Sequence, residues 1–268
     1  MALIEKQRVN EAVFNKIKQI FTKSAAIILF FAVWELIARL GMVEAFILPP
    51  VTAVLKAYGV LISSGELFVH IAVSLQRTAT GFFIALIIAI PLGIFMGWFS
   101  KLEQFLDPIL QMFRNTSVLA MFPVFILVFG LGETSKAAIV FWGSVWPALL
   151  STISGVKNVD PLLIKSANSM GISVIGLFKK VILPAALPEI MTGVRLSAGV
   201  ATIILVAAEM LGASKGIGFL IFYSEQKYEI PTMYAGIISI SVLGVLINFL
   251  LVKLESRITY WKERQTAA

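Results

Sequence analysis

Long apolar runs separated by short polar stretches are the dominant pattern along this chain. Four windows carry no charged residue over about 18 residues or more, the length that a bilayer-spanning helix needs. These windows are 78–100, 115–132, 137–156 and 230–252. Two further windows, 24–41 and 196–211, are apolar apart from Glu35, Arg39 and Glu209. The pattern predicts an all-α, polytopic membrane protein with about six transmembrane helices.

The composition agrees with a membrane protein. Hydrophobic residues make up 59% of the chain and charged residues 14%, whereas a soluble domain carries about 25% charged residues. There is no cysteine, which excludes disulfides and thiolate chemistry. The net charge of +7 does not indicate nucleic acid, because basic residues of membrane proteins gather on the cytoplasmic side. We expect the chain to lie in a lipid bilayer and to bind no nucleic acid.

The distribution of lysine and arginine predicts the orientation. If the N-terminus is cytoplasmic, 15 of the 22 basic residues lie in the cytoplasmic segments, which are 1–23, 101–114, 157–188 and 253–268. This positive-inside bias places both termini in the cytoplasm of a multi-pass cell-membrane protein. The first residues lack the pattern of a cleaved signal peptide, so we expect no removed leader. Residues 24–268 are expected to form a single transmembrane domain after the cytoplasmic segment 1–23.

Two segments between the predicted spans have local structure of their own. On the outer side, residues 42–76 are too polar to span, and a short helix over 56–62 is expected after two prolines. In the cytoplasmic loop 157–188, Asp160 suits an N-cap and Pro161 the first helical position, and Gly171 suits the helix end.

The same cytoplasmic loop continues with a second short helix, predicted over Val174–Val181. It is expected to stop before Pro184, and Pro184 and Pro188 would form a stiff link into the fifth span. Two short helices at an angle make a compact knob, on which a small residue such as Ala167 would let a partner approach closely.

The knob carries a family resemblance. Lys165-Ser166-Ala167, Gly171 and the aliphatic-Leu-Pro element ending at Pro184 resemble the cytoplasmic motif of binding-protein-dependent ABC importer permeases. That motif begins Glu-Ala-Ala and has glycine six positions after the glutamate, so Lys165 and Ser166 depart from it. Other segments resemble the nitrate, sulfonate, taurine and bicarbonate branch of the family; they are 113–116, 129–136, 183–190, 206–209 and 216–218. The resemblance covers roughly residues 47–265.

The resemblance implies a type I ABC importer permease fold and a set of partners. Two permease chains, here taken as a homodimer, would form the path for a small anion or organic acid. Two cytoplasmic ABC ATPases would bind ATP, and an extracytoplasmic substrate-binding protein would deliver the cargo. Lys165, Ser166, Ala167, Gly171 and Pro184 would belong to the element that couples to the ATPase.

The sequence itself lacks the ATP-binding motif. The nearest match to a P-loop, Gly171–Phe178, has Leu177 and Phe178 where lysine and serine or threonine are required,. The chain is therefore expected not to be an enzyme and to hold no cofactor. His70 has no sequence neighbours suited to a metal site, so no metal is expected.

Ionisable residues within or beside the spans are candidates for the path or gate. Glu209 either lines the path, holds a gate through hydrogen bonds, or meets water at the end of its span. A gating or structural role is favoured over anion binding, because a glutamate repels an anion. Arg195 either pairs with Glu189, faces the inner vestibule or anchors at the interface. Arg77 and Arg114 attract an anion or, more simply, reach out to the interface.

Two other classes of membrane protein compete with an importer permease. A self-sufficient channel or ion-coupled carrier is the alternative function, but carriers often show repeated halves, and the sequence shows no such symmetry. An intramembrane enzyme would need clustered polar groups within the spans. Gly93 and Gly97 form a G-x-x-x-G element, which predicts close packing of two helices. Glycines over 212–218 resemble a nucleotide fingerprint only loosely, since no strand precedes them.

Overall fold

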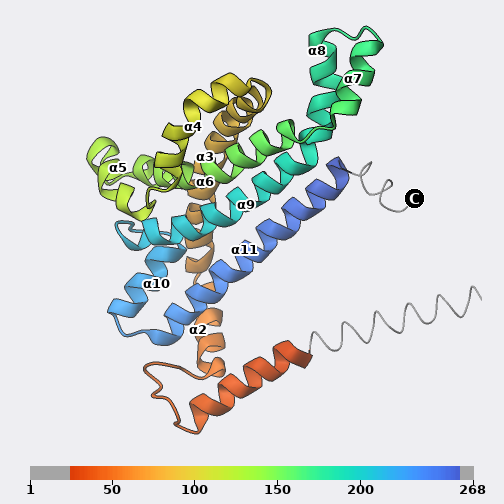
Figure 1. Ribbon diagram of the computed structural model, residues 1–268. Coiled ribbons are helices and arrows are strands. Elements are labelled where there is room, and N and C mark those ends of the chain that lie inside the picture. The colour runs from red at the N-terminus through yellow and green to blue at the C-terminus, as the bar shows by residue number, and fades with distance from the viewer. Residues whose placement is uncertain (1–24, 260–268) are drawn as a thin grey trace, which may run out of the picture.

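The computed structural model describes residues 25–259, and every regular element in that range is a helix (Figure 1). The predicted cytoplasmic segment 1–23 lies outside the described residues. The first helix covers residues 25–39. The elements after it are α2 (Val51–Ser63), α3 (Glu66–Trp98), α4 (Ser100–Arg114), η1 (Leu119–Met121), α5 (Phe122–Phe129), α6 (Glu133–Lys157), α7 (Pro161–Ser169), α8 (Val174–Leu177), η2 (Phe178–Ile182), α9 (Leu183–Met210), α10 (Ile217–Gln226) and α11 (Ile230–Ile258).

Four stretches are long and apolar enough to cross a membrane: α3, α6, the stretch Val174–Met210 and α11. The pair formed by α4 and Leu119–Phe129 would be a fifth span, but it is bent by 83°. The window 24–41 appears as a helix over the described residues 25–39. The all-α membrane class is confirmed. Within the described residues, four or five of the six predicted spans are long enough and apolar enough to cross a membrane.

The prediction of one span over 115–132 is wrong. Two polar side chains at the start of this window end the preceding helix, α4. Asn115 Nδ2 donates to the carbonyl of Gln111 at 2.8 Å, and Thr116 Oγ1 donates to the carbonyl of Met112 at 3.0 Å. These bonds satisfy carbonyls that the last turn of α4 would otherwise leave unpaired. The chain then turns into the short, very apolar helix α5.

The outer segment before the second span is more helical than predicted. The short helix expected over 56–62 is present as α2, which is longer. Gly65, with φ 77°, separates it from α3, and α3 begins at Glu66 rather than at residue 78. The extra turns of α3 hold His70, Ser74 and Arg77, which are buried. Polar residues can lie in this helix because the fold provides partners for them.

Small residues on one face of α3 let it lie directly against α6. They recur every four positions: Gly81, Ala85, Ala89, Gly93 and Gly97. A Cβ added to Gly93 would lie 2.7 Å from the Cβ of Thr152, and a Cβ added to Gly97 would lie 2.7 Å from the Cβ of Val156. The predicted close packing at Gly93 and Gly97 is confirmed.

The helix α6 also packs tightly against α9. A Cβ added to Gly193 would lie 2.5 Å from the Cβ of Ser151, and Ser197 Oγ donates to the carbonyl of Ser144 at 2.7 Å. In the span window of α6, 61% of residues are buried, against 17% in that of α11. The helices α3, α6 and α9 therefore form the packed centre, and α11 lies at its periphery (Figure 1).

The knob formed by α7 and α8 has the predicted shape. Asp160 Oδ1 accepts a hydrogen bond from the backbone N–H of Leu162 at 2.8 Å and so caps α7. Gly171, with φ 69°, takes the left-handed conformation that follows the helix end,. Ser173 then caps α8. Figure 1 shows α7 and α8 as a hairpin that projects beyond the other helices.

The connection from the knob to the fifth span differs from the prediction. The second helix does not stop before Pro184: α8 passes through the π turn η2 into α9, and Pro184 lies in the first turn of α9. The knob and α9 are thus one continuous helical stretch, Val174–Met210.

Candidate functional site

The structure separates the knob residues into exposed and buried groups. Lys165, Ser166 and Gly171 are exposed, whereas Ala167 is only 3% exposed. Ala167 belongs to the same buried cluster as Leu177 and Ile182. The expectation that Ala167 lets a partner approach is therefore wrong, because its small side chain lets α7 pack on the rest of the knob.

The exposed surface of the knob is mainly apolar and also carries lysines. Its large exposed hydrophobic side chains have exposed fractions of 49% to 79%; they are Leu162, Leu163, Met170, Val174 and Ile175. Lys165 on α7 and Lys179 and Lys180 in the adjoining η2 are also exposed. Such an apolar surface is unusual on a loop that faces water and is typical of a protein contact.

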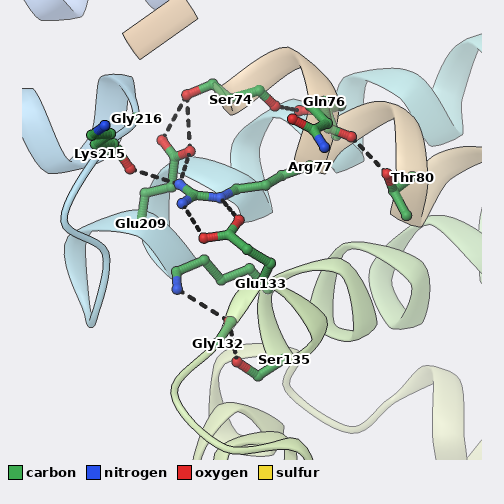
Figure 2. Close-up of polar contacts among 12 residues, drawn as sticks. Ser74, Gln76, Arg77, Thr80, Gly132, Glu133, Ser135, Glu209, Lys215 and Gly216 are labelled. Atoms are coloured by element: carbon green, nitrogen blue, oxygen red, sulfur yellow. Dashed lines mark hydrogen bonds and ion pairs between the residues drawn. The ribbon is translucent and has the colours of Figure 1, made fainter. Parts of the chain in front are cut away.

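A second candidate site surrounds Arg77, where α3, α6 and α9 meet (Figure 2). We call Ser74, Arg77, Glu133 and Glu209 the arginine cluster. The Arg77 guanidinium lies between two carboxylates: Nη1 donates to Glu209 Oε1 at 2.8 Å, and Nη2 donates to Glu133 Oε1 at 2.6 Å. Nε of Arg77 donates to the other oxygen of Glu133. One residue thereby joins three spans.

Glu209 is fully enclosed in this cluster, with its side chain 0% exposed. Besides Arg77 it accepts bonds from Ser74 Oγ and from the backbone N–H of Gly218, each at 2.9 Å. This geometry excludes the reading in which Glu209 meets water at the end of its span. Its charge is compensated by Arg77 and by hydrogen bonds, as a buried carboxylate requires.

The loop after α9 folds back onto the arginine cluster through its backbone. The carbonyl of Lys215 accepts from Arg77 Nη1 at 2.6 Å, and the N–H of Ile217 donates to Ser74 Oγ at 2.8 Å. Gly216 has φ 120°, and a Cβ there would lie 2.2 Å from Glu209 Oε1. Only glycine fits at this position, so Gly216 is required for the loop to close over Glu209.

Two more polar residues complete the surroundings of the cluster. His70 Nδ1 accepts a hydrogen bond from the N–H of Gly216 at 3.0 Å, so this histidine fixes the loop. Lys136, only 3% exposed, donates to the carbonyls of Leu131 and Gly132 at 3.2 Å. Among the described residues, no group of three or more His, Asp or Glu side chains is arranged to hold a metal ion.

The three tentative path residues are not brought together. Glu209 lies in the arginine cluster, and Arg195 Nη1 donates to Glu255 Oε2 of α11 at 3.0 Å rather than pairing with Glu189. Arg114 is exposed at the end of α4. The simpler reading of Arg77, as an arginine that reaches the membrane interface, is wrong because its side chain is 5% exposed and doubly paired.

The spacing of polar residues before residue 78 indicates the arginine cluster, although a search for uncharged windows does not detect it. His70, Ser74 and Arg77 have spacings of four and three residues, which places them on one face of a helix. Three polar residues on one face of a span predict that the face is turned inward. Glu133 gave no such signal, because it follows a loop and its partner is 56 positions away.

Comparison with known proteins agrees with this architecture. Residues 89–260 match the family described as binding-protein-dependent transport system inner membrane component. The chain is 40% identical over 231 residues to an aliphatic sulfonates transport permease protein, SsuC, of Bacillus subtilis, covering 86% of this chain and 84% of the relative. It is 33% identical over 249 residues to the taurine transport system permease protein TauC of Escherichia coli, with 91% and 90% covered.

Two further comparisons give the same result. The nitrate import permease protein NrtB of Leptolyngbya laminosa is 35% identical over 192 residues, with 72% of this chain and 69% of the relative covered. Among solved structures, an inward-facing MetNI methionine ABC transporter chain superposes with a TM-score of 0.64 at 18% identity, covering 74% of this chain and 98% of that chain. The structural likeness supports the fold, and the sequence matches support the family. The chain belongs to the family of binding-protein-dependent transport system inner membrane components.

Proposed function

We propose that this chain is the permease subunit of an ATP-driven importer for a small oxyanion or organic acid. In this proposal the knob binds a separate cytoplasmic ABC ATPase and couples its conformational change to the permease. The observation that carries the proposal is the exposed apolar surface of the knob on a helix that runs without a break into α9. A surface of this kind needs a partner, and a continuous helix transmits a displacement of that partner to the packed centre.

The orientation follows from the charge distribution and the helix directions. The end of α6, the start of α9 and the end of α11 lie on the side of the knob (Figure 1). The segment 157–188 and the last described residues of α11, with Lys253 and Arg257, belong to that side, which makes it the cytoplasmic side under the positive-inside rule. Both termini are then cytoplasmic, and the arginine cluster lies toward the outer side.

Coupling requires that the ATPase bind two permease conformations with different affinities. The knob is suited to this because Lys165 and Ser166 lie on the short capped helix α7 and Gly171 forms the turn that follows it. The basic side chains of the knob favour an ATPase surface with acidic residues beside an apolar cleft. In this scheme Pro184 lies in the continuous helix that connects the knob to the path.

The cargo class and the partners come from the relatives. The names of the relatives give aliphatic sulfonates, taurine and nitrate as their cargo, so we assign a small anion of this kind to the present chain. A substrate-binding protein on the outer side would deliver the anion, and a second copy of this chain would complete the path. ATP would be bound by the ATPase alone.

The test reconstitutes this chain with its ATPase and binding protein in liposomes and measures ATP-driven uptake of taurine, methanesulfonate and nitrate. Met170→Glu places a charge on the knob surface, where the wild-type side chain is 79% exposed. We expect uptake to fall at least roughly tenfold, because a charge is costly in an apolar contact. Lys56→Glu, on exposed α2, is the control.

Two readouts decide the outcome. The variant protein must stay in the membrane and keep its melting temperature, so that a loss of uptake reports lost coupling. If Met170→Glu imports at the wild-type rate, the knob is not the ATPase contact. If the wild-type chain purifies without a P-loop protein and moves solute without ATP, the importer assignment falls in favour of a carrier.

A further inference from the structure

A recess between α9 and α11 has the chemistry of a small-anion site. Its volume is about 250 Å³, and its lining includes Arg195, Gly199, Thr202, Gly244 and Asn248, with no acidic residue. At about 30 Å³ for each water-sized group, it offers room for roughly eight such groups. Its lining residues, which also include Ala198, Ile203 and Ile247, lie near the middle of α9 and α11.

The guanidinium of Arg195 in the recess has only some of its N–H donors paired with the protein. Arg195 donates from Nη1 to Glu255 Oε2 at 3.0 Å, and its side chain is 37% exposed. A guanidinium has five N–H donors, and this pair is its one ion pair among residues 25–259. The remaining donors are available to an oxyanion, for which arginine is well suited because its fork matches two oxygens at once.

A second donor is an amide in the midst of an apolar helix. Asn248 lies on α11, whose span window has a mean hydropathy of 2.5. Its side chain is exposed and has no hydrogen-bond partner within the described part of the chain. A polar group at this depth without a partner is unfavourable. Thr202, by contrast, uses its hydroxyl hydrogen on the carbonyl of Ala198 at 3.0 Å.

The backbone leaves the space open. A Cβ added to Gly199 or to Gly244 would meet no heavy atom within 4 Å, so glycine is not required there for packing, unlike Gly93 on α3. Both glycines line the recess, and the absence of a side chain at each leaves it wider.

We propose that this recess is a mid-membrane station for the transported anion, in which Arg195 and Asn248 bind the oxygens of a sulfonate, nitrate or carboxylate group. Glu255 holds Arg195 when the station is empty, and the anion competes with Glu255 for the guanidinium. The paired Glu209 is enclosed by Arg77, so it does not repel the cargo. This inference rests on the proposed importer function.

The experiment uses the full importer in liposomes, with labelled taurine, methanesulfonate and nitrate as probes. Arg195→Gln is expected to lower uptake roughly ten- to a hundredfold, as loss of a charge-assisted bond does. It should leave ATPase stimulation by the binding protein in place. Gly244→Leu fills the recess and should also lower uptake, whereas Gly59→Leu, where a Cβ likewise meets nothing within 4 Å, should not.

A charge swap separates anion binding from a purely structural ion pair. Arg195→Glu combined with Glu255→Arg keeps a pair between α9 and α11 but places a carboxylate in the recess. We expect the swap to stay inactive in uptake. If the swap restores uptake, the pair is structural and the inference is overturned.

The remaining outcomes also decide. If Arg195→Gln and Gly244→Leu both import at the wild-type rate, the recess holds lipid and not cargo. If Gly244→Leu prevents assembly of the permease pair, as measured by particle size, the recess is a contact with the second copy. In either case the importer function still stands. If the wild-type importer takes up no probe with ATP, the proposed function and this inference fall together.

Discussion

The substitution Glu209→Gln tests whether the arginine cluster holds the outer part of the fold together. The carboxylate accepts hydrogen bonds from Arg77, Ser74 and Gly218. A glutamine has nearly the same shape but a single oxygen, so its NH₂ group must face the donor of either Arg77 or Gly218. The substitution therefore places donor against donor and leaves Arg77 with one carboxylate instead of two.

The magnitude follows from the burial of the pair. The side chains of Arg77 and Glu209 are 5% and 0% exposed, and breaking a buried pair costs about 3–5 kcal/mol. In a protein of this size each kcal/mol lowers the melting temperature by about 2–4 °C. The variant should therefore melt roughly 6–20 °C lower than the wild-type protein.

The assay is thermal unfolding of the purified chain in detergent, followed by the fluorescence of its 5 tryptophans. Glu133→Gln is the matched control: the Glu133 side chain is 67% exposed, so its loss should cost about 1 kcal/mol or less. Arg77→Met added to Glu209→Gln should recover part of the stability, because no buried charge is left unpaired. Equal losses for Glu209→Gln and Glu133→Gln, or strictly additive losses in the double variant, would refute the reasoning.

Three further substitutions probe other parts of the fold. Gly216→Ala should destabilise the chain strongly because its Cβ would lie 2.2 Å from a buried carboxylate oxygen, whereas Gly212→Ala, with its nearest atom at 3.7 Å, should not; equal melting temperatures would contradict this. Gly93→Ala should lower stability by about 1–3 kcal/mol through overpacking, while Gly199→Ala should raise it by about 0.4–1 kcal/mol; thermal unfolding in one detergent compares them, and the opposite order would refute the packing argument. Asp160→Ala removes an N-cap worth about 1 kcal/mol, so amides of α7 should exchange hydrogen about fivefold faster, and unchanged exchange would show that the cap does not stabilise the knob.

Much of the fold could be predicted because its signals are local. The spans, the capping residues Asp160 and Pro161 and the turn at Gly171 depend on neighbours within a few positions. The same holds for the G-x-x-x-G element, although the sequence did not indicate that α6 is its partner. Where the apolar window 115–132 failed, the cause was also local: side chains of Asn115 and Thr116 bind the preceding carbonyls, and a count of charges does not detect such a cap.

The candidate site could be predicted only in part, because its contacts join distant segments. Arg77 binds Glu133 and Glu209, which lie 56 and 132 positions further along the chain. No periodicity within one helix identifies such partners. The surroundings of Ala167 and Pro184 depend on how α7 folds back and how η2 continues into α9, which no local pattern indicates. Arg195 had several partners within reach, and the choice of Glu255 follows from the packing of α11.

The π turn at Phe178–Ile182 sets the direction in which the knob points. A π turn contains one residue more than the α-helical turn it replaces, and each residue of an α-helix contributes about 100° of rotation and 1.5 Å of rise. A helix without that extra residue would therefore present the knob about a quarter-turn or more around the α9 axis. The angular register between the α7–α8 hairpin and the faces of α9 is thus encoded by a single inserted position, so changes in length are far less tolerable there than changes in side chain.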